Sequence, residues 1–299
     1  MSPFVAHRRT CNSSAREIEM QITKRHVARG ISRLFSLLHG FFRSVGVVEG
    51  VVLLARLLWI RAERSGMVRR LRVPGSSHEV WLRTQTRDAH LYQQIFVDRQ
   101  YDIDCTPQGQ WVQNAYVRSV NRGERPLIVD CGANVGFASV YYALRFPGAT
   151  IVSVEPDFGN MRMLRLNVSG LTNVFPVHAA VWDRRGRLDF VCDGADSSAF
   201  RVTEATGDGV VETVTLDEIR EQFGDGTAFV VKMDVEGSES RLFRSTDWVN
   251  HTLLIALELH DWLLPGERSS HSFQRALGTK PREILSQGEI IFALDSDQL

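Results

Sequence analysis

The sequence predicts a doubly wound α/β fold, in which helices cover both faces of a mostly parallel sheet. From residue 127 onward, apolar runs of strand length alternate with segments of helical length, and short links join them. Two of the runs, 228–235 and 253–260, are almost continuously apolar. Such runs are typical of central parallel strands, which are buried on both faces.

The predicted elements follow in order along the chain. We expect helices at 135–145 and 157–168, each between two apolar runs. We expect strands at 127–131, 150–156, 173–181, 187–192, 210–216, 228–235, 253–260 and 289–294, with a polar loop around 196–198.

Composition narrows the class of protein. The 299 residues include 35 basic and 35 acidic side chains, so the formal net charge is zero. A balanced charge gives no reason to expect a nucleic-acid partner. The four cysteines are scattered without a CxxC pair, which favours neither a disulfide framework nor a zinc site. We therefore expect a reducing compartment and a cytoplasmic protein.

The first 75 residues differ from the rest, because they are rich in arginine and contain two apolar runs, 31–42 and 45–60. Glu49 and Arg56 interrupt the second run, so we expect amphipathic helix rather than a membrane span. The preferred interpretation is a helical cap on the main domain. Peripheral contact with an anionic membrane through residues 31–60 is the alternative, and an N-terminal targeting peptide has less support. The sequence thus divides into a basic, partly amphipathic helical segment and an α/β domain, 1–75 and 76–299.

Acidic side chains mark the ends of the predicted strands. In an open α/β sheet the ligand binds beyond the carboxyl ends of the strands. Burying carboxylates there is costly unless a partner satisfies them, although acids also cap helices and close turns. Because they share one edge of the sheet, we interpret these residues as a binding site: Asp130, Glu155, Asp234, Glu236, Glu258 and His260.

The segment LIVDCGANVGFAS, 127–139, places a glycine loop between a strand and a helix. It lacks the G-x-G-x-x-G fingerprint, because Asn134 and Phe137 occupy the second and third glycine positions counted from Gly132, and it is no P-loop. An acid about twenty residues later, here Glu155, suits the hydroxyls of a ribose. The free N–H groups at the helix start suit a carboxylate as well as a phosphate. S-adenosylmethionine combines ribose, adenine and an amino-acid group without phosphate, and it is the cofactor we expect.

Four ordered motifs resemble the FkbM-type S-adenosylmethionine-dependent methyltransferases. They are VDCGANVGFAS, VSVEPD, VKMDVEGSE and IALELH, and the upstream piece at 90–103 is similar too. The resemblance implies a class I methyltransferase (Rossmann-like) fold and, commonly, O-methylation of a hydroxyl on a sugar or another small metabolite. The family pattern ends in a strand pair, whereas only 289–294 is evident here, so we expect a final strand to be missing or supplied otherwise.

By position, the resemblance also implies the cofactor residues. Asp130, Gly132 and Gly136 would line the methionine end, and Glu155 would bind the ribose. We count Asn134, in the same loop, among the cofactor-binding residues. The expected adenine contact, just past the third strand, is Asp183.

The chemistry requires alignment of the acceptor oxygen with an activated methyl group and removal of a proton. His260 is the expected general base, because the pKa of free histidine lies near neutrality and the residue follows the fifth strand. Asp234 is the second candidate, although it would equally fix its own loop by accepting backbone N–H bonds. Glu236 is expected to recognise substrate hydroxyls or to cap a helix at Ser238. A divalent metal held by Asp234, Glu258 and His260 is an alternative that the spacing does not demand, and we expect none.

The leading prediction is therefore an S-adenosylmethionine-dependent O-methyltransferase that acts on a hydroxylated small molecule, a sugar or a lipid-linked acceptor. The alternative is a non-catalytic nucleotide-binding or scaffold protein with a methyltransferase-like fold. The acids retained at the strand ends argue against a decayed site, and the failed fingerprint argues against a dehydrogenase.

Overall fold

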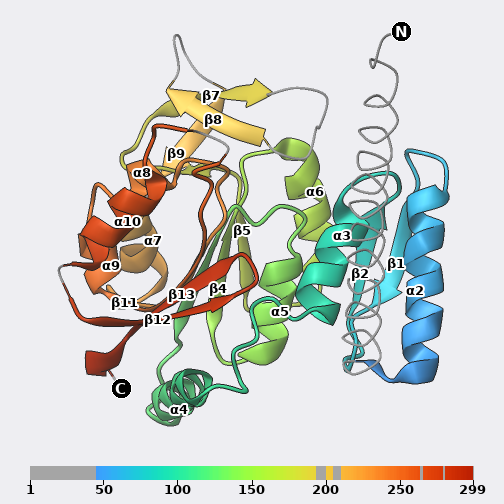
Figure 1. Cartoon of the computed structure of the whole chain (residues 1–299), viewed down its shortest axis with the longest axis horizontal. Coiled ribbons are helices and arrows are strands. Elements are labelled where there is room, and N and C mark those ends of the chain that lie inside the picture. The colour runs from blue at the N-terminus through green and yellow to red at the C-terminus, as the bar shows by residue number, and fades with distance from the viewer. Residues whose placement is uncertain (1–44, 193–199, 205–209, 263–264, 279, 299) are drawn as a thin grey trace, which may run out of the picture. The chain divides into compact units, whose positions relative to one another are not determined.

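The computed structural model describes residues 45–192, 200–204, 210–262, 265–278 and 280–298 (Figure 1). The predicted polar loop at 196–198 and the apolar run 31–42 lie outside the described residues. The chain divides into two compact units, Met1–Arg56 and Leu57–Leu299, and the α/β sheet belongs to the second.

Within the N-terminal segment, the apolar run 45–60 forms most of helix α2 (Val47–Ala62), as its pattern predicts. Helix α2 is followed by strand β1 (Val68–Arg72), which pairs antiparallel with β2 (Glu79–Arg83). No helix in the described part of the chain is long and apolar enough to cross a membrane.

The central sheet of the described residues has seven strands in the order β12-β13-β11-β10-β3-β4-β5. The parallel strands lie side by side, and β13 runs antiparallel to β11 and to the edge strand β12. The strand bounds are β3 (Leu127–Cys131), β4 (Thr150–Val154), β5 (Val174–Val177), β10 (Ala228–Met233), β11 (Thr252–Glu258), β12 (Arg282–Gln287) and β13 (Ile290–Asp295). The doubly wound, mostly parallel sheet is thereby confirmed.

Strand β12 corrects the expectation that a final strand is missing. It pairs with β13 over six registered residue pairs, so the terminal strand pair is complete. Strand β12 could not be recognised from the sequence, because this edge strand is partly exposed throughout and mixes polar with apolar residues. Ile284, one of its few apolar residues, is 52% exposed, so no buried apolar periodicity marks the strand.

The predicted strand 173–181 is also corrected, because it is two strands in two sheets. Strand β5 ends at Val177, whereas β6 (Ala180–Val181) pairs with β9 (Val211–Val214). Both pieces are apolar, so the pattern could not show that the chain leaves one sheet for another. Strand β9 also pairs with β7 (Arg187–Cys192), which pairs with β8 (Phe200–Glu204).

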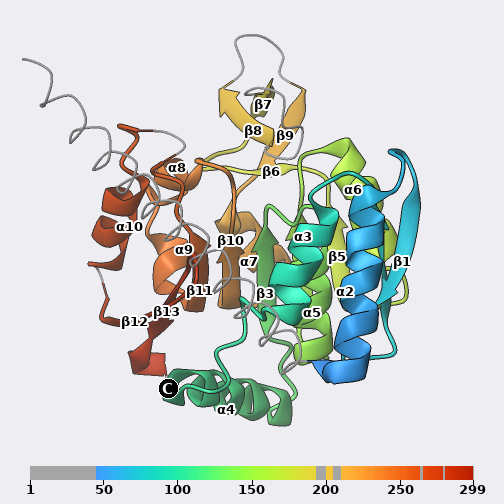
Figure 2. The ribbon, with the colours of Figure 1, turned by 45° about the vertical axis from the view of Figure 1, so that its right-hand side comes forward.

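Helices cover both faces of the central sheet (Figures 1 and 2). Alternate residues of β3 point to opposite faces. Asp130 contacts Ser139 of α5 (Phe137–Arg145) on one face. The other face packs a core that includes Leu127, Val129, Leu216, Ile219 and Trp248 against α7 (Leu216–Phe223) and α9 (Asp247–Asn250).

The remaining helical segments of the described chain are mostly short. They are α3 (Asp88–Tyr92), the π-helical turn η1 (Gln93–Val97), α4 (Pro107–Asn121), α6 (Phe158–Asn167), α8 (Glu239–Leu242), α10 (Ser269–Leu277) and the terminal 3-10 turn η2 (Ser296–Gln298). The amide of Asn167, in α6, joins two other regions, since its Oδ1 accepts from Trp81 N at 2.6 Å and its Nδ2 donates to Val135 O at 2.8 Å. The β1–β2 hairpin is thereby tied to the start of α5.

Candidate active site

The glycine loop after β3 lies directly against the loop after β10. Gly132 has φ of 72°, and a Cβ atom there would lie 1.9 Å from the carbonyl oxygen of Asp234. Asp234 N in turn donates to Cys131 O at 3.1 Å. A side chain at Gly132 would therefore push the two loops apart, which explains why glycine stands at this position.

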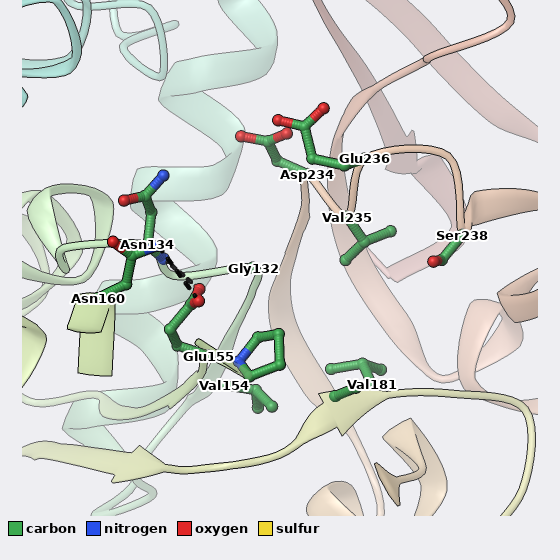
Figure 3. A pocket seen from close by; sticks show the side chains of 12 residues that line it. Gly132, Asn134, Val154, Glu155, Asn160, Val181, Asp234, Val235, Glu236 and Ser238 are labelled. Atoms are coloured by element: carbon green, nitrogen blue, oxygen red, sulfur yellow. Dashed lines mark hydrogen bonds between the residues drawn. The ribbon is translucent and has the colours of Figure 1, made fainter. Parts of the chain in front are cut away.

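Glu155, which follows β4, is held by backbone N–H groups. Its Oε2 accepts from Asn134 N at 2.8 Å (Figure 3). Its Oε1 accepts from Asp157 N at 2.9 Å. The side chain is almost fully buried, and burial raises its pKa to about 7 despite these hydrogen bonds. Asn134 adopts φ of 51°, which turns its N–H toward this carboxylate.

A first cavity opens between the glycine loop after β3 and the loop after β10. The carboxylate of Glu155 and the side chain of Asn160 lie on one wall, and the apolar side chains of Val181 and Val235 face them (Figure 3). The other residues that line this cavity are Gly132, Asn134, Val154, Pro156, Ala180, Asp234, Glu236 and Ser238. A cavity with one buried acid and an apolar wall suits a ligand that is polar on one side and flat and apolar on another.

Asp130 does not line this cavity. It is fully buried, accepts from Ser139 Oγ at 2.6 Å and forms an ion pair with Lys232 at 3.1 Å. Burial by itself lowers the pKa of Lys232, but Asp130, Tyr101 and Asp234 together raise it well above its ordinary value. Lys232 Nζ also donates to Gly132 O at 2.8 Å. The buried pair thus holds the glycine loop through its backbone carbonyl.

Sequence reasoning missed Lys232, although one signal was present. A lysine inside an otherwise apolar central strand has to find a buried partner, because an unpaired buried charge is costly. The sequence did not show that Asp130 is this partner.

A carboxylate–histidine cluster forms after β10 and β11, which we define as Asp234, Glu236, Glu239, Glu258 and His260. His260 Nε2 lies 3.7 Å from one oxygen each of Asp234, Glu236 and Glu258. Its Nδ1 lies 2.6 Å from Glu239 Oε1, and both of these side chains are buried. The structure therefore brings together the three residues predicted as catalytic.

The pKa values in this cluster are shifted by burial and by neighbouring charges. Burial and the repulsion of Asp234 raise the pKa of Glu258 to about 7 and also raise that of Glu236. Burial alone would lower the pKa of His260, but the hydrogen bond to Glu239 and the charge of Asp234 raise it to about 9. Glu236 also has φ of 50°, an unusual backbone conformation for this residue type.

A second cavity, of about 650 Å³, adjoins the first. Four residues line both cavities, namely Asn134, Asn160, Asp234 and Glu236. The rest of the second lining is rich in polar side chains, including Arg83, Asp88, Gln94, Gln100, Glu258 and Gln287. The two cavities therefore meet at the carboxylates of the cluster, and Figure 3 shows Asp234 and Glu236 with these groups side by side.

The other predicted site residues fall outside the cavity walls. Gly136, with φ of 87°, leaves room for Leu164, since a Cβ atom there would lie 2.4 Å from Leu164 Cδ1. Asp183 does not line either cavity, and its carboxylate lies 3.7 Å from Arg244. His260 also lines neither cavity, although three carboxylates around it line one or both. The roles assigned to these residues stay predictions.

Two residues of the site were not singled out by sequence reasoning. Asn160 lies in α6, near its start, where Asp157 Oδ1 accepts from Asn160 N at 2.7 Å. Glu239 stands in the motif KMDVEGSE, but only its contact with His260, 21 residues away, gives it a role.

The sheet order, with antiparallel β13 inserted between β11 and β12 and a ligand cleft at the carboxyl edge, is that of a class I, Rossmann-like methyltransferase fold. The sequence profile of the methyltransferase FkbM domain matches residues 130–279. The chain therefore belongs to the FkbM methyltransferase family. No curated protein sequence matches it.

Several solved structures are similar in part. The methyltransferase FkbM from Methylobacillus flagellatus KT is 16% identical over 57% of this chain and 43% of its own, with a TM-score of 0.37. EvdMO1 is 16% identical over 64% of this chain and 42% of its own, with a TM-score of 0.33. The precorrin-6y C5,15-methyltransferase from Geobacter metallireducens GS-15 is 12% identical over 65% of this chain and 93% of its own, with a TM-score of 0.34. Likenesses this weak carry no conclusion about activity, and the family assignment rests on the sequence profile.

Proposed function

We propose that the protein transfers a methyl group from S-adenosylmethionine to a hydroxyl of a small molecule, a sugar or a glycolipid. The observation that carries this proposal is the meeting of two cavities at Asp234 and Glu236. One cavity has the features of a cofactor site, and the other is larger and lined with polar groups.

The lining of the first cavity matches the chemistry of the cofactor. Each Glu155 oxygen accepts one backbone N–H bond at 2.8 or 2.9 Å, which leaves lone pairs on a buried carboxylate for the two ribose hydroxyls. The absence of a side chain at Gly132 gives the backbone close access to the ligand. Val181 and Val235 offer an apolar wall for a flat base. When bound, the cofactor supplies a methyl group on a positively charged sulfur.

The second cavity fits a polyhydroxylated acceptor. Its lining offers both amide and charged groups, among them Gln94, Gln100 and Gln287. Side chains that both donate and accept hydrogen bonds match sugar hydroxyls, which do the same. A polar cavity of about 650 Å³ thus supports a sugar-like or other polar acceptor.

The carboxylates around the junction, Asp234, Glu236 and Glu258, hold the acceptor hydroxyl, and one of them receives its proton. Asp234 and Glu236 reach both cavities, and each is 28% exposed at its side chain. A general base of this kind contributes about 10²–10⁴-fold in rate. His260 contacts these carboxylates from their buried side and holds them in position.

Calorimetry with S-adenosylhomocysteine tests the cofactor site. The full-length protein should bind it, and Glu155→Ala should weaken binding by about 1–3 kcal/mol, because two ribose hydroxyls lose their buried partner. Glu221→Ala, at an exposed position of α7, is the matched control and should bind as the parent does. A parent protein that does not bind the compound would favour the non-catalytic alternative.

Incubation with a radiolabelled methyl donor and fractionated cell extract tests the acceptor. An O-methyl ether should keep its label after mild alkali, whereas a methyl ester would lose it. Label that appears only in esters, in protein or in nucleic acid would contradict the proposed acceptor class.

A further inference from the structure

We propose that Asp234, Glu236 and His260 bind a divalent cation of the Mn²⁺ type where the two cavities meet. The spacing of these residues along the chain does not demand a metal, so the inference rests on the geometry of the carboxylate–histidine cluster. The cation's part in catalysis rests on the proposed methyl transfer, but its binding does not.

The distances in the cluster suit a shared cation better than direct hydrogen bonds. One ligand atom from each of the three residues lies within 4.8 Å of the other two. The 3.7 Å separations from His260 Nε2 to Asp234 Oδ1 and to Glu236 Oε2 are too long for hydrogen bonds. Two ligand atoms held at about 2.1 Å from one ion lie about 3–3.5 Å apart. Contraction of the cluster would therefore close the site around a cation.

His260 is oriented as metal-binding histidines usually are. Glu239 is fully buried and lies 2.6 Å from Nδ1. Because a carboxylate accepts hydrogen bonds, Nδ1 donates to Glu239, and Nε2 faces the carboxylates of Asp234, Glu236 and Glu258. Glu239 is itself fixed by Gly237 N at 3.2 Å and by Ser269 Oγ at 3.5 Å.

His260 Nε2 is the second, independent sign of a ligand. The side chain is only 3% exposed, and among the described residues no group lies within hydrogen-bond distance of Nε2. Oxygens of Asp234, Glu236 and Glu258 all lie at the same 3.7 Å distance from this buried atom, as they would around a shared ligand.

Nearby positive charge does not cancel the charge of the cluster. Lys232 is paired with Asp130 at 3.1 Å and lies 3.8 Å from Asp234 Oδ2, on the buried side. Glu236 and Glu258 have no such neighbour within 4 Å except His260 among the described residues. The donor set of carboxylate oxygens with one imidazole suits Mn²⁺ and related ions.

A cation here would act on the acceptor hydroxyl. Coordination would lower the hydroxyl's pKa, and Glu258, which lines the acceptor cavity, would take the proton. The oxygen then forms a bond to the methyl carbon while the carbon–sulfur bond breaks and its electron pair stays on sulfur. S-adenosylhomocysteine, the methyl ether and a protonated carboxyl group are the products, so atoms and charges balance.

The test is a titration of the chelator-stripped, full-length protein with Mn²⁺, in which electron paramagnetic resonance measures free Mn²⁺ without any methyl donor. We expect one saturable site per chain. Asp234→Asn and His260→Ala should each weaken binding at least tenfold, and Glu239→Gln should weaken it by about 10–100-fold. Glu221→Gln, an exposed carboxylate on α7, should change nothing.

Calorimetry with S-adenosylhomocysteine on the same samples separates the two proposals. Binding of S-adenosylhomocysteine without saturable Mn²⁺ binding overturns the cation site and leaves the proposed function intact. The reverse result overturns the proposed function and keeps the cation site. If His260→Ala does not fold, Asp234→Asn decides, and Mn²⁺ binding that this variant leaves unchanged overturns the inference.

Discussion

The two halves of the sheet's carboxyl edge hold their charges in different ways. After β3 and β4, a single buried carboxylate, Glu155, is satisfied by two backbone N–H groups. After β10 and β11, four carboxylates surround one imidazole, and three of them stay beyond hydrogen-bond distance of its Nε2. In the proposed function the first half binds neutral ribose hydroxyls, whereas the second keeps an excess of negative charge that only a proton or a cation can balance.

The two halves meet where the loop after β3 contacts the loop after β10. Gly132 in the first half approaches the carbonyl of Asp234 in the second, and Lys232 contacts both Asp130 and the Gly132 carbonyl. The proposed function therefore assigns cofactor binding to one half and proton removal to the other. Variants in each half should separate them.

The largest expected effect is on the rate of methyl transfer. His260→Ala should lower kcat by about 10²–10⁴-fold, because the carboxylates that face the acceptor lose their buried partner. Its affinity for S-adenosylhomocysteine should stay that of the parent, since His260 does not line the cofactor cavity. Single-turnover kinetics with calorimetry measures both quantities. A variant that loses affinity and rate together would mean that the two halves are not independent.

The next effect concerns the contact between the halves. Gly132→Ala should reduce the free energy of unfolding by about 1–3 kcal/mol more than Gly75→Ala does. Both glycines have φ of 72°, but a Cβ atom at Gly75 meets nothing within 4 Å, whereas one at Gly132 meets a backbone oxygen at 1.9 Å. Urea denaturation measures the loss of unfolding free energy in both variants. The strain of the left-handed backbone is common to both, so the difference between them gives the cost of the steric clash. Equal losses would show that the loops can separate freely.

The smallest expected effect is the pH dependence of the first half. Burial, with repulsion from Asp157, raises the pKa of Glu155 from 4.5 to about 7. Ribose hydroxyls are bound best by the ionised carboxylate, so affinity for S-adenosylhomocysteine should fall roughly tenfold as the pH drops one unit below this pKa. Calorimetry between pH 8 and pH 6 measures this, and Glu155→Gln should remove the dependence.

The raised pKa of Glu155 affects stability in the opposite direction from ligand affinity. A raised pKa in the folded state stabilises the ligand-free protein below pH 4.5, and this contribution is lost as the pH rises through about 7. Thermal unfolding of the ligand-free protein against Glu155→Gln checks it. A parent whose affinity and stability both rose with pH would contradict the assignment of Glu155.

Most of the central sheet and the edge that carries the site could be predicted from local patterns. Continuous apolar runs mark β3, β4, β10 and β11, because these strands are buried on both faces. Acids at the ends of such runs identify the carboxyl edge from residue order alone. Edge strand β12 could not be recognised, because a partly exposed strand lacks the apolar periodicity on which the prediction depends.

The contacts that complete the site could not be predicted in this way. Asp130 stands at the end of a strand like the other acids, yet its side chain points to the α5 face and pairs with Lys232. Asp183 follows the predicted third strand, but the chain has by then entered a different sheet. In both cases the orientation depends on which elements pack together.

By itself, the sequence determined the alternation of strands and helices, the glycine loop and the acids at the strand ends, because each follows from the physical chemistry of neighbouring residues. The tertiary structure decided which acids face a cavity, which are buried in ion pairs and that Glu239 orients His260. Those contacts are made between residues that are distant in the chain. Hydrogen bonds and ion pairs act over only a few ångströms, so they form only after folding has brought the residues together.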